Sequence, residues 1–355
     1  MGVPVRAAGA VEAELLAAAR AGDEDAFRSL AEPHVAELRL HCYRMLGSLH
    51  DAEDSVQETL VRAWRRLAGF EGRSTLRAWL YRIATNVCLS AVARRRRRDE
   101  PIHVGPVPDT LLDELPSTEA GPAALYDLRE SVQLAFLAAI QLLPPRQRAV
   151  LILREALAWS AGEVADLLDV TEASVNSALQ RARASLERER REDRLPERSR
   201  PPAAAERTLL RRFVAAWEAV DIDGLVALLK EDAVLTMPPF PMRFVGRGAI
   251  GEFLARVPAG GALDRIQLVP TRANRQPAVA AYMLDPKEEV HRAYGIMVLA
   301  LDGKAIGEIT GFSDPSLFAS FGLEVMLSPV LSGAGGGSGG APSFPGSERT
   351  SSPEA

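Results

Sequence analysis

Trp79, Arg82 and Asn86 are the residues of this sequence whose types and spacing most clearly suggest chemistry. They stand at i, i+3 and i+7, so in a helix they share one face. Bases of a single nucleic-acid strand can stack on the aromatic ring and hydrogen-bond to the amide, while the guanidinium binds phosphate. The spacing predicts a site for an unpaired strand. The alternative, which the sequence leaves open, places the tryptophan in the core and the arginines on a solvated face.

The stretch around these residues is divided by charge. It opens with the acids Asp51, Glu53, Asp54 and Glu58 and closes on five consecutive arginines, Arg94 to Arg98. From Arg62 to Arg98 there are eleven arginines against one acid, Glu71, in a chain of 355 residues with a net charge of -5. Two adjacent segments of opposite charge predict two different partners, of which the basic one is suited to a polyanion.

Hydrophobic periodicity predicts that these segments are helices. Val56, Leu60, Ala63 and Leu67 form one apolar stripe, and Leu76, Leu80, Ile83 and Val87 form a second. Residues 11–46 add two more helices around a break at Gly22-Asp23. We therefore expect an all-α domain over residues 11–98.

Residues 99–122 differ in composition, with five prolines, six acids and no lysine or arginine. Such a segment is expected to be an extended, self-repelling linker. It is either a passive tether or a segment that lies along a basic channel of a partner.

A second helical domain is predicted over residues 123–192. Ser160 and Glu163 have the spacing of a capping box, and a tight turn at Asp169-Val170-Thr171 precedes a last helix. A short helix, a tight turn and a longer helix indicate a helix-turn-helix, which gains weight from the basic block upstream. The exposed side chains expected to reach base edges or phosphates are Ser174, Asn176, Ser177, Gln180, Arg181 and Arg183.

Beyond a Pro-rich linker, residues 206–323 mix helical and strand-like segments, and Asp302-Gly303 is a hairpin signal. The Gly- and Ser-rich residues 328–355 are expected to be a disordered tail. The predicted fold class is therefore multidomain: two all-α domains followed by an α+β domain.

The two cysteines, Cys42 and Cys88, stand in apolar helical contexts and predict buried thiols rather than a disulfide. We expect no metal site and no cofactor. No stretch is long and apolar enough for a membrane span, and residues 1–10 lack the features of a signal peptide. These observations predict a cytoplasmic protein.

Two blocks of motifs resemble extracytoplasmic-function (ECF) sigma factors, over residues 11–190. Asp51-Ala-Glu-Asp-Ser-Val-Gln-Glu-Thr-Leu60, Phe70-Glu-Gly-Arg-Ser74 and Trp79-Leu-Tyr-Arg-Ile-Ala-Thr-Asn86 look like the segment that binds core polymerase and the −10 element. Leu143-Pro-Pro-Arg-Gln-Arg148, Gly162-Glu-Val-Ala-Asp-Leu-Leu168 and Val175-Asn-Ser-Ala-Leu-Gln-Arg-Ala-Arg183 look like the −35-binding domain.

The resemblance implies a role for each set of residues. The core RNA polymerase would bind the acidic helix through Asp51, Asp54, Gln57 and Glu58. Asn86 would contact a flipped-out −10 base, and Trp79 and Arg82 would guide the strand. The −35 residues would face the major groove of promoter DNA, and the acidic linker would follow the RNA channel of the polymerase. Asn176 and Ala178 stand where many relatives carry a basic residue, which implies a weaker −35 hold.

The C-terminal region resembles the SnoaL-like branch of the nuclear transport factor two (NTF2)-like fold, through Leu235-Thr-Met-Pro-Pro-Phe-Pro241, Gly246-Arg-Gly248 and Glu308-Ile-Thr-Gly-Phe-Ser-Asp-Pro315. Some sigma factors carry such a domain. The side chains expected to line or fill its cavity are Met237, Phe240, Phe244, Phe253, Tyr282 and Tyr294. Four ionisable candidates, Asp232, Asp264, His291 and Glu308, have no spacing that requires an acid–base pair, so we expect no catalytic residues.

A regulatory role for this domain is expected instead. It would pack on both helical domains and set whether they can spread on polymerase, with a small-molecule ligand or an anti-sigma protein as further candidate partners. The rival function is a SnoaL-type cyclase or isomerase fused to a DNA-binding module, which would be active without binding polymerase. A third, a helix-turn-helix repressor, would bind duplex DNA without polymerase.

Overall fold

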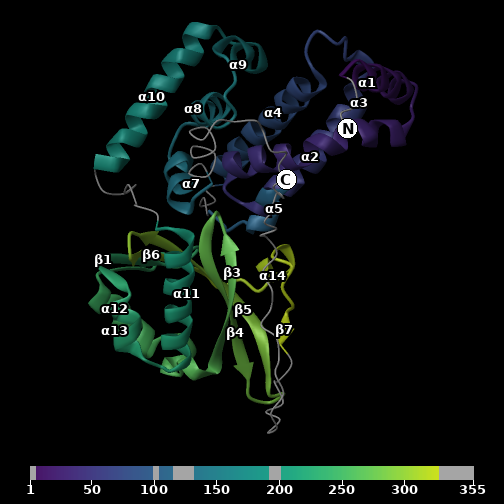
Figure 1. The fold of residues 1–355 in the computed structure, drawn as a ribbon. Helices are drawn as coiled ribbons and strands as arrows, with labels where there is room; N and C mark the ends of the chain where they lie inside the picture. The colour runs from purple at the N-terminus through teal and green to yellow at the C-terminus, as the bar shows by residue number, and fades with distance from the viewer. Residues whose placement is uncertain (1–4, 99–103, 115–131, 192–200, 328–355) are drawn as a thin grey trace, which may run out of the picture.

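The computed structural model describes residues 5–98, 104–114, 132–191 and 201–327. We call residues 5–98 the first helical domain, residues 132–191 the second helical domain and residues 201–327 the C-terminal domain. Figure 1 shows both helical domains at one end of the molecule and the sheet of the C-terminal domain at the other. Segment 104–114 lies between them.

The first helical domain consists of α1 (Val5–Arg20), α2 (Glu24–Leu46), α3 (Leu49–Arg66) and α4 (Leu76–Arg97). A side chain caps the start of each of the last three: Asp23, Ser48 and Thr75 accept hydrogen bonds from backbone amides of the first turn. Gly47 ends α2 with a φ of 79°, a left-handed conformation that favours glycine. The four helices predicted from periodicity are confirmed.

The core of this domain also buries polar groups. His41 on α2 is fully buried, its Nε2 lies 2.9 Å from the Thr85 hydroxyl, and its ring packs 5.1 Å from that of Tyr81. Burial lowers the pKa of His41 to about 3, and the neighbouring Arg44 guanidinium acts in the same direction. The imidazole is therefore neutral in the folded chain at neutral pH.

The second helical domain contains α7 (Leu134–Gln141), α8 (Pro145–Leu151), α9 (Ala161–Leu168) and α10 (Glu172–Arg191), and α8 continues into a π-helical turn at Ile152–Ala156. The capping box is present, since Ser160 accepts from the Glu163 amide and Glu163 accepts from the Ser160 amide. Asp169 forms the turn between α9 and α10 with a φ of 56°. The first residues of the predicted domain, 123–131, lie outside the described residues.

The two helical domains share one core. Arg148 of α8 is fully buried and donates to the carbonyls of Met45 and Ile140, the latter at 2.9 Å. The rings of Tyr81 on α4 and Trp159 before α9 lie 5.2 Å apart. A guanidinium at the carbonyl end of α2 is favoured by the helix dipole, so Arg148 fixes the second domain against the first.

The prediction of an extended, self-repelling linker is wrong for residues 104–114. This segment forms a short helix, α5 (Asp109–Asp113), and the Gly105 amide donates to the Gly47 carbonyl at 2.8 Å. The composition argument failed because basic residues far away in the sequence neutralise its acids, which removes the self-repulsion.

The C-terminal domain is built on a seven-stranded sheet. Its strands are β1 (Leu229–Thr236), β2 (Arg243–Val245), β3 (Ile266–Ala273), β4 (Gln276–Asp285), β5 (Val290–Asp302), β6 (Ala305–Phe312) and β7 (Met326–Leu327). The order is β2-β1-β6-β5-β4-β3, with β7 paired to β5; β1 and β6 are parallel and the other pairs antiparallel.

The expected strands are present, and the Asp302-Gly303 hairpin is confirmed by the pairing of Asp302 with Ala305. Just before β3 the chain forms a 3-10 turn at Leu263–Arg265. The short strands β2 and β7 were not predicted, because two or three residues carry too little alternation to recognise.

Helices cover both faces of this sheet (Figure 1). One face packs against α11 (Ala203–Glu218), α12 (Ile222–Ala227) and α13 (Arg247–Arg256), with a 3-10 turn at Pro258–Gly261 after α13. The other face packs against α14 (Leu317–Ser320) and also against Leu134 of α7 and Val104 of the linker segment. The sheet is therefore part of a core that it shares with the helical half.

We predict that His41 makes stability depend on pH below neutrality. The unfolded imidazole binds a proton near pH 6.5 and the folded one only near pH 3, so folding stability is lost as pH falls through this window. Between pH 7 and pH 5 the wild-type chain should lose about 2 kcal/mol more than His41→Gln. Denaturant titration at both pH values measures the difference, and equal losses would contradict the assignment.

Candidate nucleic-acid interface and domain junction

The structure brings Trp79, Arg82 and Asn86 onto one face of α4. Arg82 and Asn86 are exposed, and the Asn86 amide donates to the Arg82 carbonyl at 2.9 Å. Trp79 is half-buried, with its ring 4.9 Å from that of Phe70. Part of the indole therefore packs on the domain core. The rest stays accessible beside the exposed Arg82 guanidinium and the exposed Asn86 amide.

The acidic residues of α3 do not all have the same environment. Asp54, Gln57 and Glu58 are exposed, and Glu58 accepts from Arg62 at 2.6 Å. Asp51 is half-buried and forms an ion pair with Arg95, one of the five consecutive arginines. The acidic and basic segments are thus joined by the Glu58–Arg62 pair within α3 and by the Asp51–Arg95 pair between α3 and α4.

The helix-turn-helix presents its predicted residues to solvent. All of them lie on the exposed side of α10: Ser174, Asn176, Ser177, Gln180, Arg181 and Arg183. Val175, Leu179 and Ala182 are buried on the opposite side. Arg183 is also bonded to Glu155 at 2.6 Å. Ala178 is buried as well.

Asn274 lies where the three parts of the molecule meet. It stands in the turn between β3 and β4 with a φ of 55°, and it is fully buried. Its amide nitrogen donates to the Tyr43 hydroxyl at 2.7 Å and to the Val132 carbonyl at 2.6 Å. Its amide oxygen accepts from the Val107 amide at 2.9 Å. One side chain therefore binds the first helical domain, the second helical domain and the linker segment.

The Tyr43 hydroxyl extends this network. It donates to the Gly105 carbonyl at 2.7 Å while it accepts from Asn274. Burial raises the pKa of Tyr43, and the hydrogen bond from Asn274 only partly offsets this effect. The hydroxyl is neutral and can act as donor and acceptor at once.

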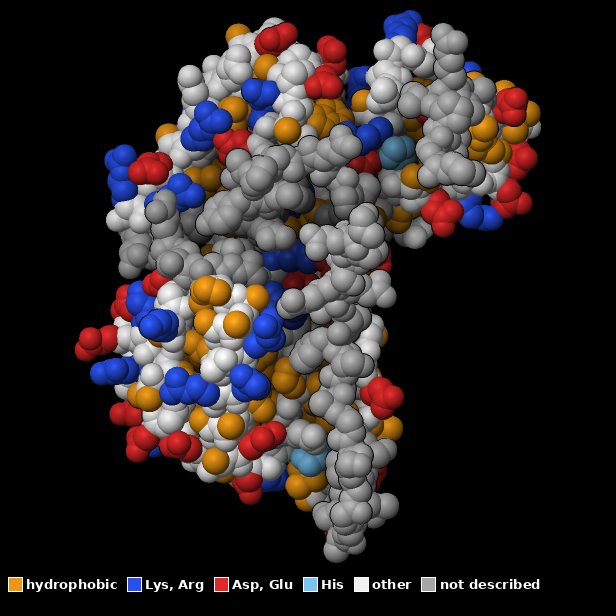
Figure 2. All heavy atoms as spheres, in the orientation of Figure 1, with side chains coloured by type: hydrophobic (Ala, Val, Ile, Leu, Met, Phe, Trp, Pro, Cys, Tyr) orange, Lys and Arg blue, Asp and Glu red, His pale blue; other side chains and the backbone are white. Residues whose placement is uncertain are grey.

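Two arginines next to Asn274 hold the acids of the linker segment. Arg272 Nε lies 2.9 Å from Asp109 Oδ2, and the same guanidinium forms an ion pair with Glu206. The Arg275 amide donates to Asp109 at 2.7 Å, and its guanidinium pairs with Asp113. Burial lowers the pKa of Arg272, but Glu206 and Asp109 outweigh it and raise the pKa overall. Figure 2 shows basic and acidic side chains side by side at the level between the two halves.

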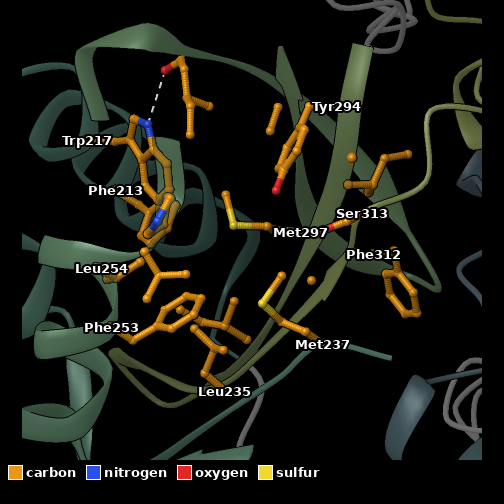
Figure 3. Close-up of a pocket in the computed structure, with 18 residues that line it drawn as sticks. Phe213, Trp217, Leu235, Met237, Phe253, Leu254, Tyr294, Met297, Phe312 and Ser313 are labelled. Carbon is orange, nitrogen blue, oxygen red and sulfur yellow. Dashed lines mark hydrogen bonds between the residues drawn. The ribbon is translucent and has the colours of Figure 1, made fainter. Parts of the chain in front are cut away.

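The C-terminal domain contains a cavity of about 80 Å³ between α11, α13 and the sheet (Figure 3). Three of the six predicted residues, Met237, Phe253 and Tyr294, line it. Phe240, Phe244 and Tyr282 do not, which corrects the expectation.

The reasons for these three differences are geometric. Phe240 is 53% exposed in the β1–β2 connection, and Phe244 packs against Phe253 with the ring centroids 4.6 Å apart but does not itself reach the cavity. Tyr282 follows Ala281, which lines the cavity, so it points to the opposite face of β4. There its hydroxyl donates to the Glu324 carbonyl at 3.0 Å.

None of the four ionisable candidates of this domain lines the cavity. Asp232 and Asp264 are exposed, and His291 and Glu308 are half-buried elsewhere on the sheet. In the part of the chain that the structure describes, no group of three or more potential metal ligands comes together. Over the same residues, no helix has the length and apolar character needed to cross a membrane.

Comparisons with known proteins agree with the three-part structure. Models of Sigma-70 region 2, Sigma-70 region 4 and a SnoaL-like domain match residues 30–98, 133–186 and 210–306. The ECF RNA polymerase sigma factor SigG of Mycobacterium tuberculosis is 43% identical over 325 residues, which cover 87% of this chain and 86% of SigG. The chain belongs to the ECF RNA polymerase sigma factors.

Other relatives match different extents of this sigma factor. SigW of Bacillus subtilis is 29% identical over 187 residues, which cover 48% of this chain and 92% of SigW. The crystal structure of SigJ from Mycobacterium tuberculosis covers 81% of this chain and 97% of its own, with a TM-score of 0.55 at 22% identity. That structure supports the fold of all three parts. The chain is an alternative sigma factor and not an enzyme.

The sequence reasoning missed the residues of the domain junction. Asn274 was left between two expected strands, although Asn is one of the few residues that adopt a left-handed turn readily. Arg272 and Arg275 flank it at a hairpin, and the acidic linker had no assigned partner within the chain. The available signal was charge complementarity between these segments, which are more than 150 residues apart.

We predict that Arg272→Ala loosens the linker segment of this sigma factor. The change removes the guanidinium that pairs with Asp109 and Glu206, which are 8% and 4% exposed, at a cost of roughly 1–3 kcal/mol. Limited proteolysis should cut residues 104–114 at least several-fold faster than in the wild type. Arg211→Ala, which removes an exposed arginine from α11, is the control and should not change the rate.

Proposed function

We propose that this sigma factor directs core RNA polymerase to promoters through three exposed helix faces. The acidic face of α3 binds the polymerase, the Trp79, Arg82 and Asn86 face of α4 captures the unpaired −10 strand, and α10 reads the −35 duplex. The observation that carries this proposal is that all three faces stay accessible while the domains are docked. Asp51 is the exception, because its carboxylate pairs with Arg95.

The chemistry of the α4 face suits capture of a base that has left the duplex. Flipping a base costs a few kcal/mol of stacking and pairing, which contacts in a protein site can offset. Stacking on an aromatic ring contributes about 1–3 kcal/mol per base. An exposed amide one turn beyond an exposed arginine adds hydrogen bonds to the base edge and a contact to the backbone.

The second part of the proposal is that the C-terminal domain restrains the two helical domains. Asn274 is bonded to Tyr43 in the first domain and to the Val132 carbonyl at the start of the second. Movement of either domain away from the other would break one of these bonds and leave a buried amide unsatisfied. Asp109 of the linker segment is meanwhile buried and held by the Arg272 guanidinium and the Arg275 amide, so it cannot bind another basic surface.

We infer that polymerase binds the two helical domains spread apart, so that its three contacts form together only in the undocked state and its binding has to compete with this docking. If only a fraction of the chains is undocked, the apparent association constant for polymerase equals the intrinsic constant multiplied by that fraction. The cyclase alternative gains no support, because the described lining of the cavity contains no carboxylate, histidine or lysine and its one ionisable side chain, Tyr294, has no second group to form an acid–base pair.

We predict that Asn86→Ala reduces promoter opening roughly 10- to 100-fold, the equivalent of 1–3 kcal/mol of lost base contacts. Binding to core polymerase should not change, because Asn86 lies on α4 and not on the acidic face of α3. Permanganate footprinting measures opening, and a pull-down measures binding. Ser90→Ala, one turn further along α4, is the control. Normal opening by Asn86→Ala would show that base capture lies elsewhere.

We predict that Asn274→Gly increases the affinity for core polymerase at least several-fold. Glycine keeps the left-handed turn but removes three side-chain hydrogen bonds, each worth about 1 kcal/mol. The matched control is Gly303→Asn, which makes the reverse change in the β5–β6 turn, where Gly303 also has a positive φ of 61°. Titration of labelled polymerase gives both affinities, and an unchanged or lower affinity for Asn274→Gly would exclude a restraining role.

A further inference from the structure

Arg20, the last residue of α1, binds a distant loop rather than an acid. Its side chain is exposed, and it forms no ion pair with any of the residues that the structure describes. The guanidinium donates instead to the backbone carbonyl of Phe70, 50 residues later in the chain, and lies over the Phe70 ring at 5.9 Å from the ring centroid. A planar guanidinium that bonds a carbonyl and covers an aromatic ring fixes the position of both groups.

Phe70 stands in the connection between α3 and α4. All of residues 68–75 are exposed except Phe70, which is 7% exposed, so this residue attaches the connection to the domain core. The Phe70 amide donates to the Leu67 carbonyl at 3.0 Å, and the Phe70 carbonyl accepts from Arg20. Both backbone polar groups of Phe70 are therefore bonded, and the direction of its ring is fixed.

The Phe70 ring in turn contacts Trp79 in the first turns of α4. The two ring centroids lie 4.9 Å apart and the ring planes are inclined by 36°. A ring packed against the indole excludes some of the rotamers that the Trp79 side chain could otherwise adopt. A platform that is already in place loses less conformational entropy when a base stacks on it. A continuous row of contacts thus leads from α1 to the face proposed to capture the −10 strand.

The start of this row lies outside the part of the chain that matches the Sigma-70 region 2 model, which begins at residue 30. The motifs that predicted the −10 face contain Phe70 and Trp79 but not the arginine that contacts them. Only the packing of α1 against the α3–α4 connection brings Arg20 to this place.

We propose that Arg20 is a positioning residue for capture of the −10 strand. It holds Phe70, and Phe70 holds the Trp79 ring in the orientation in which a base stacks on it. This inference rests on the proposed role of Trp79. It assigns no DNA contact to Arg20, because the guanidinium is directed at Phe70.

The test uses the complex of the full-length chain with core polymerase and a fluorescent single strand that spans the −10 element of a promoter that the complex opens. Arg20→Met keeps an unbranched apolar stem but removes the guanidinium. It should weaken binding roughly 3- to 10-fold, the effect of losing one hydrogen bond. Arg28→Met is the control, since Arg28 is an exposed arginine on α2 whose partner, Asp25, lies in the same helix. Its affinity should equal that of the wild type.

Two further readouts separate positioning from a general loss of structure or charge. In a Trp79→Ala background, Arg20→Met should cause no additional loss, because no ring remains to be positioned. The dependence of binding on salt concentration should be the same for Arg20→Met and the wild type. A lost phosphate contact would instead make the slope of log K against log salt shallower by about 0.7.

Unchanged binding by Arg20→Met, the same further loss in the Trp79→Ala background, or a shallower salt dependence would each overturn the positioning role. If Trp79→Ala weakens binding and Arg20→Met does not, capture on α4 stands and only the role of Arg20 falls. If Trp79→Ala binds as tightly as the wild type, the proposed stacking on Trp79 is wrong, and the role of Arg20 is wrong with it.

Discussion

The arrangement of the three domains depends on a single buried amide at the tip of a hairpin. Asn274 makes its hydrogen bonds only when the first helical domain, the linker segment and the second helical domain are all in place. A buried amide that loses a partner costs about 1–3 kcal/mol, so partial separation is unfavourable. The paired acids around Arg272 and the apolar contacts of Leu134 with the sheet reinforce the same state. These contacts therefore form and break together, so the molecule has a docked state and an undocked state and few partly docked ones. A partner that binds only the undocked state can then shift the equilibrium between them.

Charge has two separate uses in this sigma factor. On α3, α4 and α10, most of the charged and polar groups proposed to contact polymerase or DNA are exposed; Asp51 is half-buried and paired with Arg95, and Glu58 and Arg183 form exposed ion pairs with Arg62 and Glu155. At the junction, Asp109 of the linker segment and Glu206 of α11 are buried and both pair with Arg272, whereas Asp113 and Glu114 are exposed. The difference is one of desolvation: an exposed ion pair contributes little, whereas breaking a buried one is costly. The exposed charges can therefore exchange partners readily, and Asp109 and Glu206 cannot.

Much of the fold could be predicted from local patterns. Apolar stripes located the helices of the first domain, Ser160 and Glu163 marked the start of α9, and Asp302-Gly303 marked a hairpin. The site residues on the helices followed from the same periodicity and lie on the faces expected for them. The linker segment and Asn274 could not be predicted, because their structure depends on pairing between residues 109 and 272 or 107 and 274. The face that Tyr282 occupies depends on strand register, which composition does not reveal.

The central claim is that the two helical domains are held together in the free chain and separate when polymerase binds. Spin labels at Ser29→Cys on α2 and Ala173→Cys on α10 would report this directly, since both positions are exposed and the native Cys42 and Cys88 are buried. Pulsed electron paramagnetic resonance should give one narrow distance distribution for the free chain, and a longer distance once core polymerase is bound. A distribution that is already broad in the free chain, or one that polymerase leaves unchanged, would contradict the account.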